Sequence, residues 1–259
     1  MRYSKFLPSA AALQAYIREF IILESELHFD SRTIPDTALV MTFRYKGKVW
    51  KLDGEKQEAL PATGISGLRK TVRLFQYERQ TANLLVVFKE GGINAFTRVP
   101  VHELFELNIS SDNLFLSSEL EELLEQLAEA VTDKERIRQA ESFLLGRLNL
   151  RNKPDPMISQ ALAFINQHSG IVRIKNLAAS LYVSQDAFEK KFRSTVGATP
   201  KQYASIIRMK DLIKKYPSYA SLTDAAYEAG YFDQSHFIKD FRLFTGRAPK
   251  DFFSNFQYW

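Results

Sequence analysis

Amide and basic side chains recur at matched positions in two segments of this chain, and they are the residues best suited to chemistry. Aligning residues 184–203 with 233–252, an offset of 49, gives eight identities in twenty positions. The identical pairs are Gln185/Gln234, Phe188/Phe237, Lys190/Lys239, Phe192/Phe241, Arg193/Arg242, Gly197/Gly246, Pro200/Pro249 and Lys201/Lys250. Amide and basic groups donate hydrogen bonds to base edges in the major groove of DNA and neutralise phosphates. The repeat therefore predicts two segments that recognise nucleic acid.

Each copy of the repeat predicts a short capped helix. Ser184 and Asp233 carry side-chain oxygens that can accept hydrogen bonds from the first amides of a helix. The two phenylalanines of each copy are four residues apart and share one helical face, while its glycine suits the left-handed residue that ends a helix. A second short amphipathic segment precedes each copy, over 174–181 and 222–229, and a brief turn joins the two. This order predicts two helix-turn-helix units.

A helical projection with the phenylalanines inside predicts which side chains face outward. They are Asp186, Glu189, Lys190 and Arg193 in the first copy and Ser235, Ile238, Lys239 and Arg242 in the second, with Gln234 at the flank. A recognition helix presents groups of this kind from its N-terminal part to the major groove. A merely solvated surface is the alternative for either helix alone, and the duplication favours recognition.

The basic charge is confined to the half of the chain that holds the repeat. Residues 1–150 carry 19 basic and 21 acidic side chains, a net charge of −2, whereas residues 151–259 carry 16 and 9, a net charge of +7. Basic groups that neutralise phosphates release condensed counterions, so a polyanion is the natural partner. A soluble basic domain without such a partner is the alternative that charge alone leaves open.

A long helix is predicted between the two units, over 200–215. Thr199 is a cap residue, Pro200 suits the first helical position, and apolar residues follow with helical periodicity. A helix of about sixteen residues spans roughly 24 Å. Such a spacer could hold two recognition helices near the ~34 Å separation of successive major grooves, so that one polypeptide reads both.

The segment from about 157 to 253 resembles the DNA-binding domain of the AraC/XylS family of bacterial transcriptional regulators. The most specific part is the run from Ala225 to Phe237, followed by Phe241, Gly246, Pro249 and Phe252, which is similar to that family's second helix-turn-helix signature. The resemblance implies a seven-helix domain over 153–259 that binds double-stranded promoter DNA. The candidate DNA-binding residues are Gln185, Asp186, Glu189, Lys190, Arg193, Gln234, Ser235, His236, Lys239 and Arg242.

Several of these residues leave alternatives open. Asp186 and Glu189 are acidic where basic or amide side chains are expected, so the first helix either binds weakly or accepts hydrogen bonds from cytosine amino groups. His236 either donates to a phosphate or packs at the start of its helix. Arg242 either reaches a phosphate or is an exposed arginine without a partner.

Residues 1–115 predict an antiparallel β domain. Alternating or apolar runs lie at 16–23, 38–45, 49–52, 72–77, 84–88 and 95–99. Asp53-Gly54 is a hairpin signal, and Gly91-Gly92 marks another turn. The family resemblance implies a cupin-like barrel for sensing, although strand patterning alone does not establish closure. The whole chain is therefore predicted to be of the α+β class, an antiparallel β domain followed by helices.

Two antiparallel helices are predicted over 116–150. Ser118 to Glu121 and Thr132 to Glu135 both have the capping-box pattern. The first helix carries an apolar stripe of Leu120, Leu123, Leu124, Leu127 and Val131. Such a stripe either pairs two subunits into a homodimer, as the resemblance suggests, or packs on the β domain of its own chain. Residues 151–154 form the predicted linker to the helical domain.

Composition argues against enzymatic chemistry. Without cysteine the chain has no disulfide, zinc-thiolate site or cysteine nucleophile. His28 and His102, the histidines of the β domain, belong to no His-x-His cluster and stand near no carboxylate pair at metal-ligand spacing. We therefore expect no enzymatic activity, no cofactor and no metal. The alternative class is a small-molecule-binding or enzymatic cupin-like protein whose helical domain mediates protein contacts.

The predicted partners follow from the different roles of the β domain and the basic helical domain. No apolar run approaches the roughly 18 residues that a membrane span needs, and a signal peptide is not expected. We expect a cytoplasmic regulator that binds promoter DNA and makes no membrane contact. Its β domain modulates DNA binding through an unidentified small-molecule effector, through homodimerisation or through both. RNA polymerase is a further candidate partner.

Overall fold

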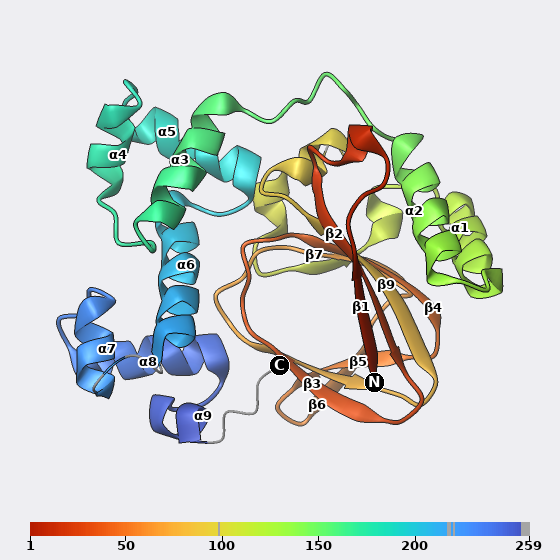
Figure 1. Cartoon of the computed structure of the whole chain (residues 1–259), viewed down its shortest axis with the longest axis horizontal. Coiled ribbons are helices and arrows are strands. Elements are labelled where there is room, and N and C mark those ends of the chain that lie inside the picture. The colour runs from red at the N-terminus through yellow and green to blue at the C-terminus, as the bar shows by residue number, and fades with distance from the viewer. Residues whose placement is uncertain (98, 217–218, 220, 255–259) are drawn as a thin grey trace.

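The computed structural model describes residues 1–97, 99–216, 219 and 221–254, and it divides into a β-rich part and a helical part (Figure 1). The β-rich part contains ten strands among the described residues, and two helices lie against it. Seven further helices follow in the described part of the chain. The predicted α+β class, antiparallel strands first and helices afterwards, is confirmed.

The strands form two antiparallel sheets. The first has six strands in the order β1 (Arg2–Phe6), β2 (Ile17–Ser25), β9 (Thr81–Phe88), β4 (Val40–Lys46), β7 (Thr63–Ser66) and β10 (Asn108–Ser110). The second has four strands in the order β3 (Phe29–Thr33), β8 (Arg73–Tyr77), β5 (Val49–Asp53) and β6 (Lys56–Ala59). The predicted hairpin at Asp53-Gly54 joins β5 to β6, with Asp53 opposite Lys56.

Side-chain alternation gives the six-stranded sheet two different faces. On β9, Leu84, Val86 and Phe88 are fully buried and belong to the main hydrophobic core. This core includes the apolar sides of α1 (Ser117–Glu129) and α2 (Asp133–Leu145), which therefore cover that face of the sheet. Leu85 and Val87 point the other way and belong to a separate small cluster. The space between the two sheets is thus more sparsely filled than the space under the helices.

The structure corrects the predicted strand at 95–99. Gly92–Ala95 is a 3-10 helix, η2, that begins after Gly91 in the left-handed region at φ +77°. Arg98 lies outside the described residues. Two short 3-10 helices, η3 (Val101–Leu104) and η4 (Ser111–Asn113), follow, and η1 (Ala11–Leu13) lies between β1 and β2. Strands β1, β3, β7 and β10 were not predicted, because they are short and lack a clean apolar alternation.

The helical pair also differs from its prediction in two respects. Helix α1 begins at Ser117 without a side-chain cap, so the capping box predicted from Ser118 is wrong, whereas the box at Thr132 and Glu135 is present. Val131 lies beyond the end of α1 and is 87% exposed, so it does not belong to the stripe. Leu120, Leu123 and Leu127 are buried in the core shared with the β domain of the same chain, and Leu124 is half-buried against it. Packing within the chain is the alternative that the structure shows for these leucines.

The helical part contains two helix-turn-helix units joined by a rod (Figure 1). The elements are α3 (Pro156–Gln167), α4 (Ile174–Ser180), α5 (Gln185–Val196), α6 (Pro200–Lys215), α7 (Leu222–Glu228), α8 (Gln234–Thr245) and α9 (Pro249–Ser254). Helices α4 and α5 form the first unit, α7 and α8 form the second, and α6 joins them. The sixteen residues of α6 match the predicted range, with a capping box between Thr199 and Gln202 and Pro200 at its start.

The two units have different cores. The first shares one continuous hydrophobic core with the β domain, through Phe188, Phe192 and Tyr203. The second has its own cluster, centred on Phe237 and Phe241. Among the described residues, no helix is long and apolar enough to cross a membrane.

Candidate DNA-binding surface

Both recognition helices begin and end as their sequences predict. The Ser184 hydroxyl accepts a hydrogen bond from the amide of Ala187 at 3.3 Å. The Asp233 carboxylate accepts two, from the amides of Ser235 and His236 at 2.9 and 3.3 Å. At the other ends, Gly197 and Gly246 adopt φ values of +90° and +75°, where a side chain would be strained. The duplicated segments are therefore capped helices of equal length.

The phenylalanine pairs give both helices the same orientation in their units. The rings of Phe188 and Phe192 meet at 5.7 Å and 62°, and those of Phe237 and Phe241 at 5.6 Å and 62°. All four rings are fully buried. Aromatic rings packed edge to face at this distance hold a helix in a preferred rotation. The opposite face of each helix is consequently turned away from its core.

The predicted contact residues lie on these outer faces. In α5, Gln185, Asp186, Lys190 and Arg193 are exposed and Glu189 is half-buried. In α8, Gln234, Ser235, His236, Lys239 and Arg242 are all exposed. Ser235, Lys239 and Arg242, together with Ile238 and Leu243, line a shallow open groove along α8.

Some of the predicted contact residues form contacts within their own unit, and others do not. The Gln185 amide donates to the Glu189 carboxylate at 2.7 Å, so these two groups of α5 partly satisfy each other. The His236 ring lies 5.6 Å from the ring of Tyr231 and 3.5 Å from the Asp240 carboxylate. His236 thus makes contacts within its own unit, which is the packing alternative raised for it. Lys239 and Arg242 make no ion pair with any described residue.

The β domain contacts both recognition helices at their C-terminal ends. The Asn94 amide donates to the carbonyl of Thr195 at 2.8 Å, near the end of α5. The amide of Val72 donates to the carbonyl of Leu243 at 3.1 Å, and the Arg32 guanidinium donates to the carbonyl of Thr245 at 3.4 Å, near the end of α8. The N-terminal halves of both helices remain uncovered by these contacts. These halves carry most of the predicted base-reading groups.

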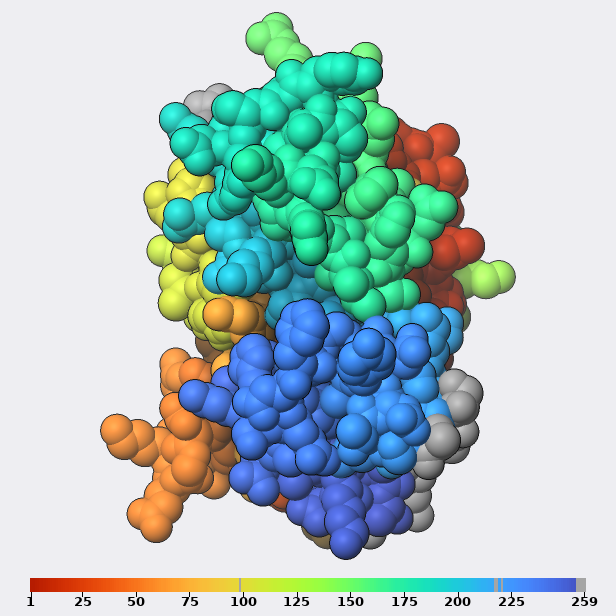
Figure 2. Space-filling model, turned by 90° about the vertical axis from the view of Figure 1, so that its left-hand side faces the viewer, coloured from red at the N-terminus to blue at the C-terminus, as the bar shows by residue number. Residues whose placement is uncertain are grey.

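The two units also share one face of the molecule. Figure 2 shows the first unit above the second on the same side, with the β domain behind them. Helix α6 spans the distance between them (Figure 1). A DNA duplex could therefore approach both units from one direction.

Sequence reasoning missed two exposed aromatic side chains in the turns that lead into the recognition helices. Tyr182 is 96% exposed and Phe232 is 101% exposed. Tyr182 occupies a left-handed position at φ +58°, where the second unit has Gly230 at φ +75°. The second turn is one residue longer, and Phe232 is the added residue next to the cap Asp233. An aromatic residue one or two positions before a helix cap, in the turn between two short helices, is the sequence signal that could have identified them.

Arg208 and Tyr231 pack together inside the second unit. The Arg208 guanidinium lies 4.4 Å from the centre of the Tyr231 ring, and burial raises the pKa of Tyr231 to about 12. This arginine supports the second unit from inside. Across the described residues, no three His, Asp or Glu side chains come close enough to hold a metal ion.

Two capped helix-turn-helix units with exposed hydrogen-bond donors define the structural class of the protein: it is a double helix-turn-helix protein. Residues 177–255 match a family model described as "Helix-turn-helix domain". The C-terminal part of the chain therefore carries a helix-turn-helix domain of the AraC type. Residues 4–110 match a second family model, described as a domain of unknown function (DUF6597). Comparison with curated proteins gives no match.

Several solved structures are similar to this chain. ToxT from Vibrio cholerae strain SCE256, bound to an unsaturated fatty acid, is 12% identical over 90% of this chain and 94% of its own, with a TM-score of 0.44. A DNA-binding transcriptional dual regulator from Escherichia coli K-12 is 22% identical, over 40% of this chain and 100% of its own, with a TM-score of 0.36. The C-terminal domain of AraT, a response regulator from Geobacillus stearothermophilus, is 20% identical, over 40% and 89%, with a TM-score of 0.37.

Proposed function

We propose that this regulator reads two adjacent major-groove segments of promoter DNA, one with α5 and one with α8. The observation that carries the proposal is the matched exposure of the same faces of two duplicated helices. The helix of sixteen residues between them is roughly 24 Å long, and we propose that it holds them near the ~34 Å separation of successive major grooves. We also propose three regions of the chain: a regulatory β domain over 1–115, a helical pair over 116–150 and a DNA-binding domain over 153–259.

The second unit is proposed to make most of the sequence-specific contacts. Gln234, Ser235 and Lys239 offer amide, hydroxyl and ammonium donors near the start of α8, and each donor suits a purine edge or a phosphate. The outer face of α5 holds the carboxylates Asp186 and Glu189 close to its N-terminus, where they repel phosphates. We therefore assign to α5 a weaker role, with Lys190 and Arg193 neutralising the backbone.

Sequencing the DNA that is recovered with the protein from cells tests this proposal. The recovered fragments should share a motif with two parts about one helical turn apart. Binding to a fragment with that motif should weaken steeply as salt rises, because several phosphates are neutralised. DNA binding that is absent, or that is insensitive to salt, would contradict the assignment.

Phe232 is proposed as an apolar contact to the methyl group of thymine. Replacing Phe232 with alanine should weaken specific binding by roughly fourfold, since about one methyl-sized apolar contact of ~0.8 kcal/mol is lost. Replacing the contacted thymine with deoxyuridine should weaken the wild-type complex by a similar factor and leave the F232A complex unchanged. Fluorescence anisotropy on the paired oligonucleotides measures both. Equal sensitivity of the two proteins to deoxyuridine at every position would show that Phe232 reads no thymine methyl.

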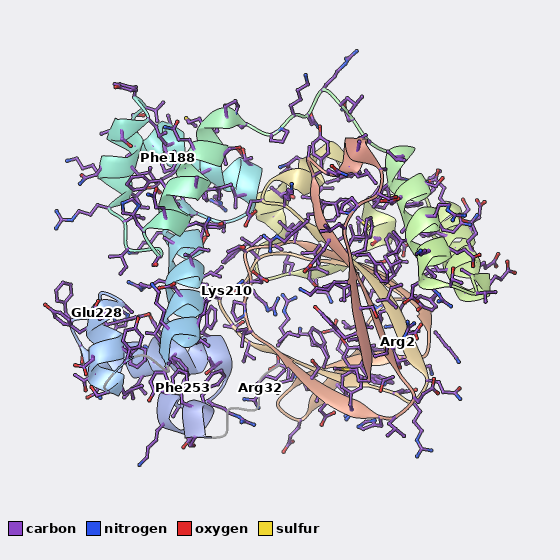
Figure 3. All side chains as sticks on the ribbon, in the orientation of Figure 1. Arg2, Arg32, Phe188, Lys210, Glu228 and Phe253 are labelled. Carbon is purple, nitrogen blue, oxygen red and sulfur yellow. The ribbon has the colours of Figure 1, made fainter. Side chains whose placement is uncertain are left out.

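The β domain is proposed to regulate DNA binding through α6. Lys210, on the side of α6 that faces the β domain (Figure 3), forms an ion pair with Asp36. About two turns toward the start of α6, the Tyr203 hydroxyl donates to the Glu90 carboxylate at 3.1 Å. Thr37 and Arg18 also donate to Glu90, both at 2.9 Å. Residues 36 and 37 therefore connect the β domain to the helix that positions both recognition helices.

The contribution of the Asp36–Lys210 ion pair should depend on pH. Burial acts to raise the pKa of Asp36, but the charge and hydrogen bond of Lys210 outweigh it and lower that pKa below its ordinary value. A depressed pKa stabilises the fold above the ordinary value of about 4, and the contribution disappears as pH falls through the folded-state pKa. The two side chains are 46% and 37% exposed, so the effect is about 0.5–1 kcal/mol.

Thermal unfolding of Asp36→Asn beside the wild-type protein measures this contribution. At pH 7 the variant should be less stable by that amount, and the difference should close below pH 4. Asp30→Asn serves as a control, because its side chain is 67% exposed and its neighbours lie within the β domain. A difference between D36N and wild type that persists unchanged at pH 3 would contradict the ion-pair assignment.

A further inference from the structure

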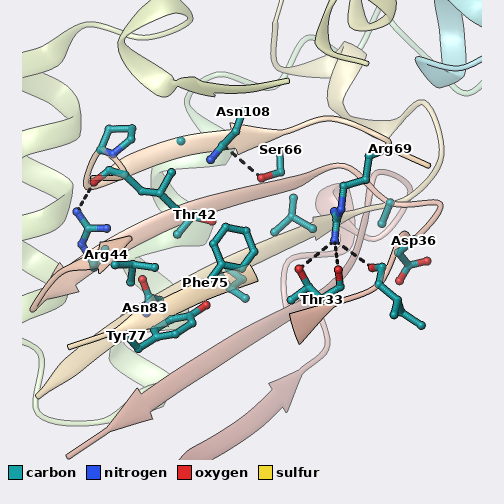
Figure 4. A pocket seen from close by; sticks show the side chains of 18 residues that line it. Thr33, Asp36, Thr42, Arg44, Ser66, Arg69, Phe75, Tyr77, Asn83 and Asn108 are labelled. Atoms are coloured by element: carbon teal, nitrogen blue, oxygen red, sulfur yellow. Dashed lines mark hydrogen bonds between the residues drawn. The ribbon is translucent and has the colours of Figure 1, made fainter. Parts of the chain in front are cut away.

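A cavity of about 290 Å³ lies between the two sheets of the β domain (Figure 4). Strands β4, β7 and β9 of the six-stranded sheet form one wall, and β5 and β8 of the other sheet form the opposite wall. The main hydrophobic core lies on the far side of the six-stranded sheet, under α1 and α2. The cavity is therefore a space that the fold leaves unfilled by its own apolar side chains.

Three hydrogen-bond donors gather at one end of this cavity (Figure 4). Arg44 on β4 and Asn83 on β9 are paired directly across the two strands, which places their side chains on the same face. Tyr77 on β8 lies opposite them and also lines the cavity. Burial raises the pKa of Tyr77 to about 12, so its hydroxyl keeps its proton and can donate.

These donors are incompletely used within the protein. The Asn83 side chain is 2% exposed, and its amide nitrogen has no hydrogen-bond partner among the described residues. The Arg44 guanidinium donates to the carbonyl of Leu60 at 2.8 Å and forms no ion pair with a described carboxylate. A buried donor without an acceptor costs stability, and so does a half-buried cation without an anion at ion-pair distance. An acceptor that enters the cavity would remove both costs.

The cavity as a whole has an excess of positive charge. Arg69, at the other end, donates only to neutral oxygens, those of Thr71, Thr33 and Ile34, at 3.0 to 3.1 Å. Burial lowers the pKa of Arg69 to about 10, with a further contribution from the nearby charge of Arg73. The lining carboxylate, Asp36, is engaged by Lys210. Two lining guanidinium groups are thus left without an anion of their own.

Apolar side chains form the middle of the cavity. Val40, Leu85 and Phe75 line it, and Phe75 lies between Arg44 and Arg69 in Figure 4. Walls of this kind favour a carbon skeleton over a free inorganic ion, because burying apolar surface of the ligand is favourable. A volume near 300 Å³ is at the small end of ligand pockets.

We propose that this cavity binds a small organic carboxylate, with the carboxylate held by Arg44, Asn83 and Tyr77 and the carbon skeleton lying against Val40, Leu85 and Phe75. The inference rests on the proposed role of the β domain as the regulator of DNA binding, and it names the chemical class of the effector. The loop that follows β3 contributes Ile34, Asp36 and Ala38 to the cavity wall, so an occupant contacts the segment whose Asp36 binds α6.

Thermal shift of the full-length protein with a panel of probes tests the proposal. The probes are the linear carboxylates from butanoate to decanoate and benzoate, each beside its neutral amide. At least one carboxylate should raise the unfolding midpoint in proportion to the logarithm of its concentration, while the matched amide should not. If no carboxylate of the panel shifts the midpoint, or if the amides shift it equally, the proposal is overturned.

Two variants locate the site. Asn83→Asp places a carboxylate opposite Arg44 and should abolish the carboxylate-dependent shift while the protein stays folded by circular dichroism. Arg44→Gln should weaken carboxylate binding at least tenfold, and the exposed Arg79→Gln should leave it unchanged. Binding that is retained in both cavity variants would show that the carboxylate binds elsewhere. DNA binding is measured on the same preparations: if it persists while carboxylate binding fails, the effector class is wrong and the proposed function stands.

Discussion

The double substitution Gln234→Ala and Lys239→Ala is expected to weaken specific DNA binding by roughly 2–6 kcal/mol. Both side chains are exposed on α8, and a good base contact contributes about 1–3 kcal/mol. The two side chains lie about one and a half helical turns apart and are proposed to touch different bases, so their losses should add approximately. Anisotropy titrations with the recovered promoter fragment at fixed salt measure the change.

A charge-matched control separates base reading from general attraction. Lys56→Ala removes the same charge from the exposed hairpin strand β6 of the β domain and should change affinity by less than twofold. The α8 double variant should also lose preference for the motif over unrelated DNA. Affinity that is unchanged in the α8 variant, or equally reduced in both variants, would remove α8 from the specific contacts.

Phe241→Ala is expected to cost about 3–5 kcal/mol of stability, the range for emptying a large aromatic site in a core. The ring is fully buried and contacts the rings of Phe237, Phe252 and Phe253 at 5.6, 5.3 and 5.4 Å. The loss should be concentrated in the second unit, because its hydrophobic cluster is separate from the one that the first unit shares with the β domain. Hydrogen exchange should show faster opening of α7 to α9 and little change in the β domain.

Phe232→Ala provides the matched control for this experiment. It removes the same side chain from the same unit, but at a position that is 101% exposed, so stability should change by less than about 0.5 kcal/mol. DNA affinity should fall in both variants for different reasons. An F241A protein as stable as F232A would contradict the view that the second unit has a core of its own.

Local signals made the helical half predictable. Capping residues, proline at a first helical position and glycine at a left-handed end act within one helical turn, and they predicted the bounds of α6 and the orientation of α5 and α8. The aromatic contacts Tyr182 and Phe232 were missed because an exposed ring in a turn has no periodic pattern around it. Val131 was misassigned because a helical projection continues past the true end of a helix.

The β domain was predictable only in class. Long central strands such as β2 and β9 have recognisable apolar runs, but β1 and β3 acquire their strand conformation by pairing with distant partners. The segment at 95–99 has strand-like composition, and the turn at Gly91 directs the chain into a 3-10 helix instead. No local pattern distinguishes these outcomes.

The amino-acid sequence by itself determined that this chain has two capped, basic recognition helices on one rod, because helix boundaries and helical faces follow from interactions between residues a few positions apart. Only the tertiary structure decided what the β domain brings together. Arg44 faces Asn83 through strand register, and Asp36 reaches Lys210 across 174 positions of sequence. Such contacts arise from the packing of whole sheets and helices, and that packing depends on the complete set of long-range pairings.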